Sequence, residues 1–112
     1  MSDLMPESVY RQHLEAGNDW ADKYGAYRLL DDITKSILAQ ESISAKRSEG
    51  CSMAEAESIA RSTSVYTDHL KSVSEAHTAA NRAKVRYDAI KVLWEARRSQ
   101  EASERAANRM QA

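Results

Sequence analysis

The chain has 112 residues, enough for one ordinary domain and too few for two. Leu, Ile and Val together number 17, Phe is absent, and Ala alone contributes 18 residues, with three Gly and one Pro. This composition excludes β-sandwiches and loop-rich enzymes and is typical of long helices packed through small side chains, while a net charge of −1 favours no class of partner.

Several classes of protein are disfavoured by what the sequence lacks. The single cysteine, Cys51, cannot form an internal disulfide framework, and a free thiol fits a reducing compartment. The first residues have no basic segment followed by an apolar core, and no apolar run is long enough to span a membrane. We therefore expect a cytoplasmic protein without a membrane partner.

The first part of the chain predicts a short helix over Pro6–Ala16. Ser2, Asp3 and Pro6 are favourable helix-start residues, and Gly17 is a stop signal. Four residues fall on one face of this helix: Val9, Tyr10, His13 and Leu14.

A second helix is predicted over residues 19–47. Asn18 and Asp19 offer an N-cap, and apolar residues then follow at steps of three and four: Trp20, Tyr24, Tyr27, Leu30, Ile33 and Ile37. A break over residues 48–63 contains Gly50 and a short helix to about Arg61. Ser52 and Glu55 have the spacing of a capping box at its start.

The most regular pattern predicts one long helix over residues 65–109. Its apolar seam alternates steps of three and four for more than four heptads: Tyr66, His69, Val73, Ala76, Ala80, Ala83, Tyr87, Ile90, Trp94 and Arg97. The predicted fold is all-α, an elongated helical hairpin or bundle with one long C-terminal helix. We expect a single helical domain over residues 1–112, divided into 1–18, 19–47, 48–63 and 64–110.

The long helix carries a second apolar stripe on its opposite face. The stripe consists of Val85, Ala89, Val92 and Ala96, with Leu93 beside it. Either the short helices of the same chain cover it, or a second copy of the chain does. Because so few large apolar residues make a weak core for an isolated monomer, the sequence favours a homo-oligomer.

No catalytic motif, metal motif or cofactor motif is recognisable, so we expect no enzyme. His69 and His77 lie eight residues apart on a helix and do not converge, and the seam position of His69 indicates a hydrogen-bonded interface residue. Asp31 and Asp32 diverge as neighbours on a helix. Cys51 is interpreted as an incidental thiol.

Charge is distributed unevenly along the chain. Residues 1–63 hold seven basic and eleven acidic side chains, a net −4, whereas residues 64–112 hold nine and six, a net +3. Basic residues recur every seven positions beside the seam: His77, Lys84, Lys91, Arg98 and Arg105. Further cations add to them: Arg82, Arg86, Arg97 and Arg109.

Two interpretations of these cations remain open. A line of cations on a helix can follow a phosphate backbone, with Tyr87 and Trp94 available for stacking on bases. Alternatively, the cations flank an ordinary coiled-coil seam, partly neutralised by Asp88 and Glu95 four residues after a lysine, while both aromatic residues belong to the core.

The stretch Leu93–Arg105 resembles the C-terminal signature of small helical proteins of tailed phages and prophages that are encoded near recombination genes. Arg98-Ser99, Ala102 and Arg105 match that signature, whereas Arg97 stands where the family usually has Trp. The similarity extends over about residues 21–110 and includes Gly50, Ser52, Glu57, Ala60, Tyr66 and Leu70. More distantly, the chain resembles the UvsY-type phage recombination mediators, which are oligomeric and bind single-stranded DNA.

The resemblance implies a phage-type accessory protein in the host cytoplasm that self-associates and binds single-stranded DNA in recombination or replication. Its partners would include a recombinase, an annealing protein or a single-strand-binding protein. One alternative is a protein-binding inhibitor or adaptor of the anti-defence type, with no affinity for DNA. Another is a structural coiled-coil component.

Overall fold

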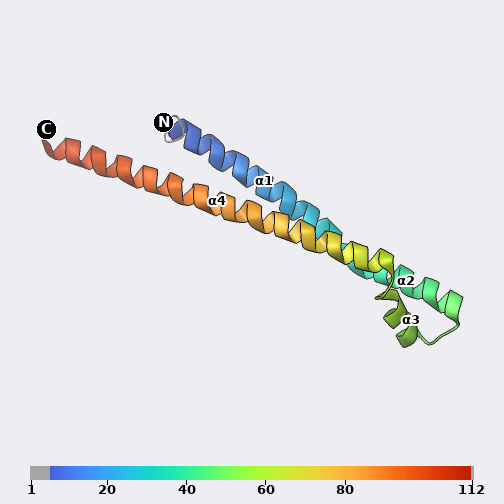
Figure 1. Cartoon of the computed structure of the whole chain (residues 1–112). Helices are drawn as coiled ribbons and strands as arrows, with labels where there is room; N and C mark the ends of the chain where they lie inside the picture. Colours follow the sequence, from blue (N-terminus) through green and yellow to red (C-terminus); the bar gives the residue numbers. More distant parts are fainter. Residues whose placement is uncertain (1–5, 112) are drawn as a thin grey trace. The chain divides into compact units, whose positions relative to one another are not determined.

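The computed structural model describes residues 6–111, which form four helices and no strand (Figure 1). These are α1 (Pro6–Asp32), α2 (Thr34–Glu49), α3 (Met53–Ala60) and α4 (Ser64–Gln111). The all-α class and the long C-terminal helix are confirmed, since α4 alone has 48 residues. Ser2 and Asp3, expected at the first helix start, lie outside the described residues.

The chain divides into two compact units. Unit 1 combines residues 1–22 with residues 81–112, and unit 2 comprises residues 23–80. Both α1 and α4 contribute to each unit, whereas α2 and α3 belong to unit 2. The single-domain organisation expected from the sequence stays a prediction.

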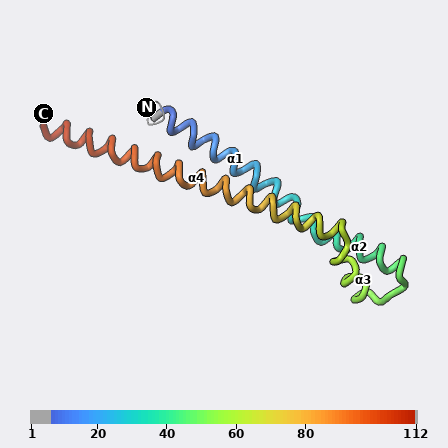
Figure 2. Tube along the Cα trace, viewed as in Figure 1, coloured from blue at the N-terminus to red at the C-terminus, as the bar shows by residue number. Residues whose placement is uncertain are grey.

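In unit 1 the N-terminal part of α1 packs against α4 in the antiparallel sense (Figure 2). Tyr10 contacts Trp94 at 5.9 Å between ring centroids, and Trp20 contacts Tyr87 at 5.3 Å. Residues later in α1 therefore meet residues earlier in α4. The buried apolar side chains of unit 1 are those of Val9, Ala16 and Ala83.

Unit 2 also pairs its helices through small side chains. His69 of α4 lies 2.8 Å from the Thr34 hydroxyl of α2, measured from Nε2 to Oγ1, and the Tyr27 ring contacts the His77 ring at 4.6 Å. α2 and α3 pack together, and the buried alanines of these two helices are Ala45, Ala56 and Ala60. The prediction that His69 is a hydrogen-bonded interface residue is confirmed.

The heptad seam of α4 is confirmed within each unit. All ten predicted seam residues, from Tyr66 to Arg97, are buried or half-buried. Because their spacing alternates between three and four, they share one side of the helix and can face a single antiparallel partner.

The helix end predicted at Gly17 is wrong, since α1 continues through Gly17, Asn18 and Asp19. A Cβ at Gly17 would lie 3.5 Å from the Tyr87 ring, an ordinary van der Waals contact, so the ring packs against α1 at this position. A glycine inside a helix costs only about 1 kcal/mol, which packing against Tyr87 and Trp20 offsets.

The predicted helix over residues 19–47 is interrupted at Ile33, where α1 ends and α2 begins. The Thr34 hydroxyl donates to the carbonyl of Leu30 at 3.3 Å and also contacts His69. A threonine that hydrogen-bonds the carbonyl four residues earlier bends a helix. The interruption therefore follows from side-chain hydrogen bonding rather than from glycine or proline.

The break after α2 is formed as the sequence predicts. Gly50 adopts φ 62°, a left-handed conformation that suits glycine, and its N–H donates to the Lys46 carbonyl. The Ser52 hydroxyl accepts from the Glu55 N–H at 3.3 Å, which confirms the N-cap of α3. Thr63 caps α4 in the same way, accepting from the Tyr66 N–H at 3.2 Å.

Two glycine substitutions test this backbone account. Gly25 lies inside α1, and nothing lies within 4 Å of where its Cβ would stand. Gly25→Ala should raise the free energy of unfolding by about 0.5–1 kcal/mol because alanine loses less backbone entropy. Gly50→Ala should lower it by about 1 kcal/mol because a Cβ is strained at positive φ. Urea denaturation measures the free energy of unfolding of both variants. Two changes of the same sign would contradict the assignment of Gly25 to a helix interior and of Gly50 to a left-handed turn.

Candidate functional site

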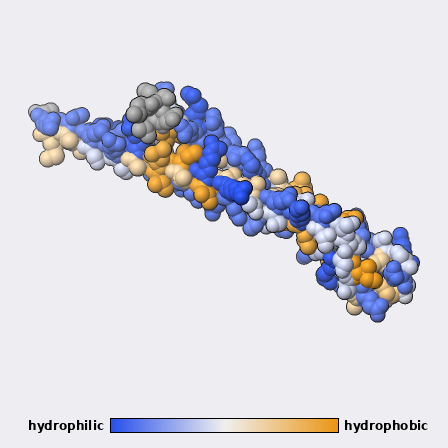
Figure 3. Space-filling model, in the orientation of Figure 1, coloured by the Kyte–Doolittle hydropathy of each residue, from blue (hydrophilic) through white to orange (hydrophobic). Residues whose placement is uncertain are grey.

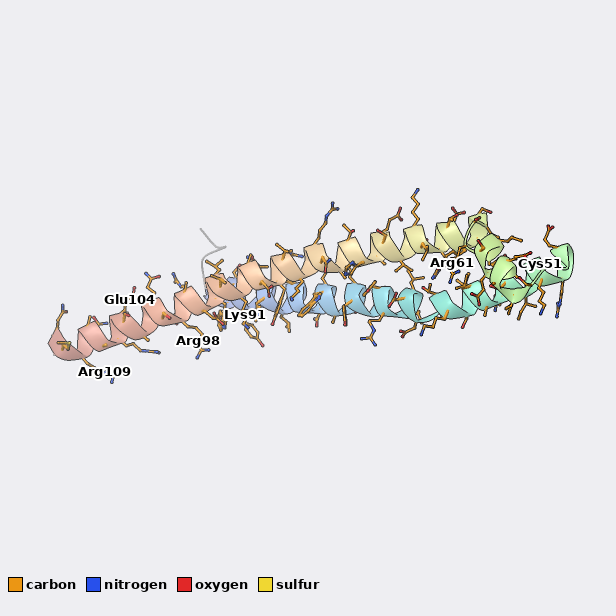
Figure 4. The ribbon with its side chains drawn as sticks, turned by 90° about the horizontal axis from the view of Figure 1, so that it is seen from below. Cys51, Arg61, Lys91, Arg98, Glu104 and Arg109 are labelled. Atoms are coloured by element: carbon orange, nitrogen blue, oxygen red, sulfur yellow. The ribbon has the colours of Figure 1, made fainter. Side chains whose placement is uncertain are left out.

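All eight predicted nucleic-acid-binding cations lie on α4 in unit 1, and five of them form one line. Residues seven apart on a helix lie almost above one another, and residues four apart are neighbours. Figure 4 shows Arg98 and Arg109 on one edge of α4 and Glu104 on the other. We call the five exposed residues the cationic row: Lys84, Lys91, Arg98, Arg105 and Arg109.

Three of the predicted cations lie elsewhere on α4. Arg82 and Arg86 are two residues away from Lys84 in either direction, which places each about 160° around the helix from the row. Arg97 is half-buried on the seam, where its Nε lies 3.7 Å from Glu101 Oε1. His77, predicted to begin the line, belongs to unit 2.

The five cations of the row form no ion pairs within the described structure. Neither of the ion pairs expected for Lys84 with Asp88 and for Lys91 with Glu95 forms within the part of the chain that the structure describes. Lys84 instead places its Nζ 5.9 Å from the centroid of the Trp20 ring. The row thus carries five positive charges over about 37 Å of helix, at about 1.5 Å per residue, and the carboxylates of Asp88 and Glu95 lie on the same side, four residues after Lys84 and Lys91.

The two aromatic residues beside the row are both half-buried but differ in their neighbours. Tyr87 is stacked on His13, with centroids 4.8 Å apart, and on Trp20 at 5.3 Å. Through these two contacts Tyr87 packs α4 against α1. Trp94 instead lines an open hollow of about 510 Å³ between α1 and α4.

Tyr10 and Leu14 complete this hollow, and the sequence pattern did not identify them as surface residues. They are 55% and 53% exposed. The face that packs against α4 is made by Val9, His13, Ala16 and Trp20, at steps of four, three and four. That alternation is visible in the sequence and places Tyr10 and Leu14 beside the seam.

The second stripe of α4 is exposed in the described structure. Val85 is 69% exposed and Val92 65%, so no described helix of unit 1 covers the stripe, and the two alternatives for what covers it stay predictions. Leu93 is also exposed, as are Ala89 and Ala96. Hydrophobic side chains reach the molecular surface in Figure 3. The same spacing continues without a charge through Ser99, Ser103, Ala106 and Met110.

Other candidate centres are not assembled. No group of three or more His, Cys, Asp or Glu residues converges as a metal site within residues 6–111. Cys51 is a half-buried free thiol, and Asp31 and Asp32 are exposed. No described helix is long and apolar enough to cross a membrane.

The stacking of Tyr87 can be tested by its effect on stability. Tyr87→Leu keeps an apolar side chain but removes two aromatic contacts, each worth about 0.5–1.5 kcal/mol, so the free energy of unfolding should fall by about 1–3 kcal/mol. Tyr24→Leu is the comparison: this exposed tyrosine contacts Tyr27 and Arg28 of its own helix, at 6.2 Å and 5.9 Å, so the loss should be smaller, about 1 kcal/mol at most. Equal urea midpoints for the two variants would contradict the packing role.

Comparisons with known proteins add no further constraint. No protein-family model matches the chain, and neither a curated protein nor a solved structure matches it. The likeness to small phage proteins therefore depends on the residues quoted for it, and the geometry of unit 1 is the basis for a functional proposal.

Proposed function

We propose that this protein is a non-enzymatic accessory protein that binds single-stranded DNA through the cationic row and self-associates through the second stripe of α4. The observation that carries the proposal is the line of five exposed cations without ion-pair partners within the described structure. Each phosphate that such a cation neutralises releases condensed counterions, which favours binding without any sequence preference.

Self-association is supported by the exposed second stripe. Val85 and Val92 present apolar surface to solvent, and the stripe keeps heptad spacing over about seven turns of helix. Burying it against a second copy would remove that surface from water. An oligomer would also present several cationic rows to one strand, so weak binding per chain becomes tight binding by the assembly.

The resemblance to phage proteins supports a place for this protein in recombination or replication. In that setting the acidic first part of the chain, with a net charge of −4, would contact a recombinase, an annealing protein or a single-strand-binding protein. Proteins of these classes carry basic nucleic-acid-binding surfaces, which a negative surface complements.

A second candidate function is binding to a protein without affinity for DNA. The observation that favours it is an apolar hollow of about 230 Å³ between α2 and α3, to which Leu38, Ile43 and Met53 contribute. Ile43 and Met53 are about half exposed. Exposed apolar surface of this kind is typical of protein interaction sites.

Salt dependence tests the cationic row. Binding to single-stranded DNA should weaken as salt rises, with a log–log slope of about −0.7 per phosphate neutralised. Lys91→Gln combined with Arg98→Gln should reduce the magnitude of that slope by about 1.4 in a fluorescence-anisotropy titration. Glutamine preserves helix propensity, so the pair removes charge and little else.

A matched control separates the row from net charge. Lys35→Gln combined with Arg47→Gln removes the same two charges from exposed positions of α2, and the slope should stay near that of the unmodified protein. If both pairs of substitutions changed the slope equally, the strand would respond to the net charge of the protein rather than to the cationic row. Failure to retain a long single strand at about 50 mM salt would overturn DNA binding, since phosphate contacts are strongest at low salt.

Light scattering tests self-association. At micromolar concentration the mass should exceed the 12.6 kDa of one chain, and Val92→Glu should shift it toward the monomer by placing a charge in a dry contact. Ser36→Glu, at an exposed site on α2, introduces the same charge away from the stripe and should leave the mass unchanged. A concentration-independent monomer mass for the unmodified protein would refute the oligomer.

A further inference from the structure

The hollow in unit 1 joins two aromatic rings from different helices. Tyr10 of α1 and Trp94 of α4 have ring centroids 5.9 Å apart and planes inclined by 55°. Glu7, Arg11 and Leu14 complete the lining. The hollow has a volume of about 510 Å³ and is widely open to solvent, so it suits a group that lies on the surface rather than an enclosed ligand. The rings thus border a space large enough for a flat aromatic group.

Cations of the row lie on both sides of Trp94 along α4. Lys91 is three residues before Trp94 and Arg98 four residues after it, so both are its neighbours on the helix surface. They stand about 10.5 Å apart along the axis. Stacked nucleotides advance by about 3.4 Å each, so this distance covers about three nucleotides of one strand. The spacing suits phosphates on either side of a base held at Trp94.

The polar residues of the hollow also suit a nucleobase. Arg11 carries N–H donors and Glu7 carries acceptor oxygens, and base edges present complementary carbonyl and amino groups. An apolar protein segment would offer no hydrogen-bonding partner to either Glu7 or Arg11. Tyr87 borders a smaller hollow of about 170 Å³, and His13 and Trp20 are stacked against its ring. Trp94 therefore offers the larger open surface of the two seam aromatics.

We infer that Tyr10 and Trp94 form a stacking site for one unpaired nucleobase, with Lys91 and Arg98 contacting phosphates of the same strand that lie about three nucleotides apart, on either side of that base. This inference rests on the proposed function, because the base belongs to the strand that the cationic row binds. It adds a preference for unpaired nucleic acid, since the faces of bases inside a duplex are already covered by their neighbours.

Fluorescence provides a direct measurement. In a Trp20→Phe background Trp94 is the sole tryptophan, and phenylalanine preserves an aromatic contact with Tyr87. Titration with oligo-dT should quench the Trp94 emission. An abasic oligonucleotide of equal length has the same phosphates but no bases, so it should bind more weakly and leave the emission unchanged.

A matched pair of tyrosine variants supplies an independent measurement in the Trp20-containing protein. Tyr10→Leu should weaken binding to oligo-dT by about five- to hundredfold, the effect of losing one stacked base, and should not change binding to the abasic strand. Tyr24→Leu removes a similarly exposed tyrosine from unit 2 and should not change either affinity. Tyr10 is more than half exposed, so its replacement leaves the buried face of α1 intact.

The outcomes separate this inference from the proposed function. Equal affinities for oligo-dT and the abasic strand, without quenching, would overturn the stacking site and leave the cationic row as the sole DNA contact. Equal binding of duplex and single strand would overturn the preference for unpaired bases. Failure of both strands to bind at about 50 mM salt would overturn the proposed function itself and favour a protein partner for the hollow.

Discussion

The packing of α4 depends on how closely other helices can approach the small residues of its seam. Ala83 in unit 1 and Ala80 in unit 2 are almost completely buried, as are Ala16 of α1 and Ala60 of α3. Alanine removes little apolar area from water, about 0.8 kcal/mol for each buried carbon, so these contacts stabilise weakly one by one. The stack of His13, Tyr87 and Trp20 supplies the large apolar contacts of unit 1. Tyr87 also packs against α1 at Gly17, where a Cβ would be in van der Waals contact with its ring.

A narrow seam leaves most of the α4 surface exposed, and its residues divide by position around the helix. Directly beside the seam runs the cationic row, and on the far side runs the uncharged stripe that includes Val85 and Val92. A broader apolar face would have covered both with partner helices. One helix can therefore serve two partners, an anionic strand along one edge and a second copy along the other. Neither use disturbs the seam.

The hollow at Tyr10 and Trp94 has a similar origin. α1 presents its packing face through Val9 and Ala16, which turns Tyr10 and Leu14 toward the edge of the contact. Trp94 is too large for the small-residue seam and remains half-exposed at the same edge. Large rings that the core does not enclose stay accessible to a ligand, and unpaired cations nearby determine which ligand is favourable. Binding and packing thus use different residues of the same two helices.

Much of this architecture follows from local sequence. The three-and-four spacing of the α4 seam, the capping serine Ser52 and the left-handed turn at Gly50 each depend on residues close together in the chain, and each was predictable. The seven-residue period of the cationic row was equally visible. Tertiary contacts decided the rest. Gly17 is helical because a ring from α4 packs against it, and the helix is interrupted at Ile33 because Thr34 hydrogen-bonds Leu30 and His69. The sequence pattern treated Tyr87 and Trp94 alike, since periodicity defines which face a residue occupies. Only the register against α1 determines which ring meets two aromatic neighbours and which borders the larger open hollow.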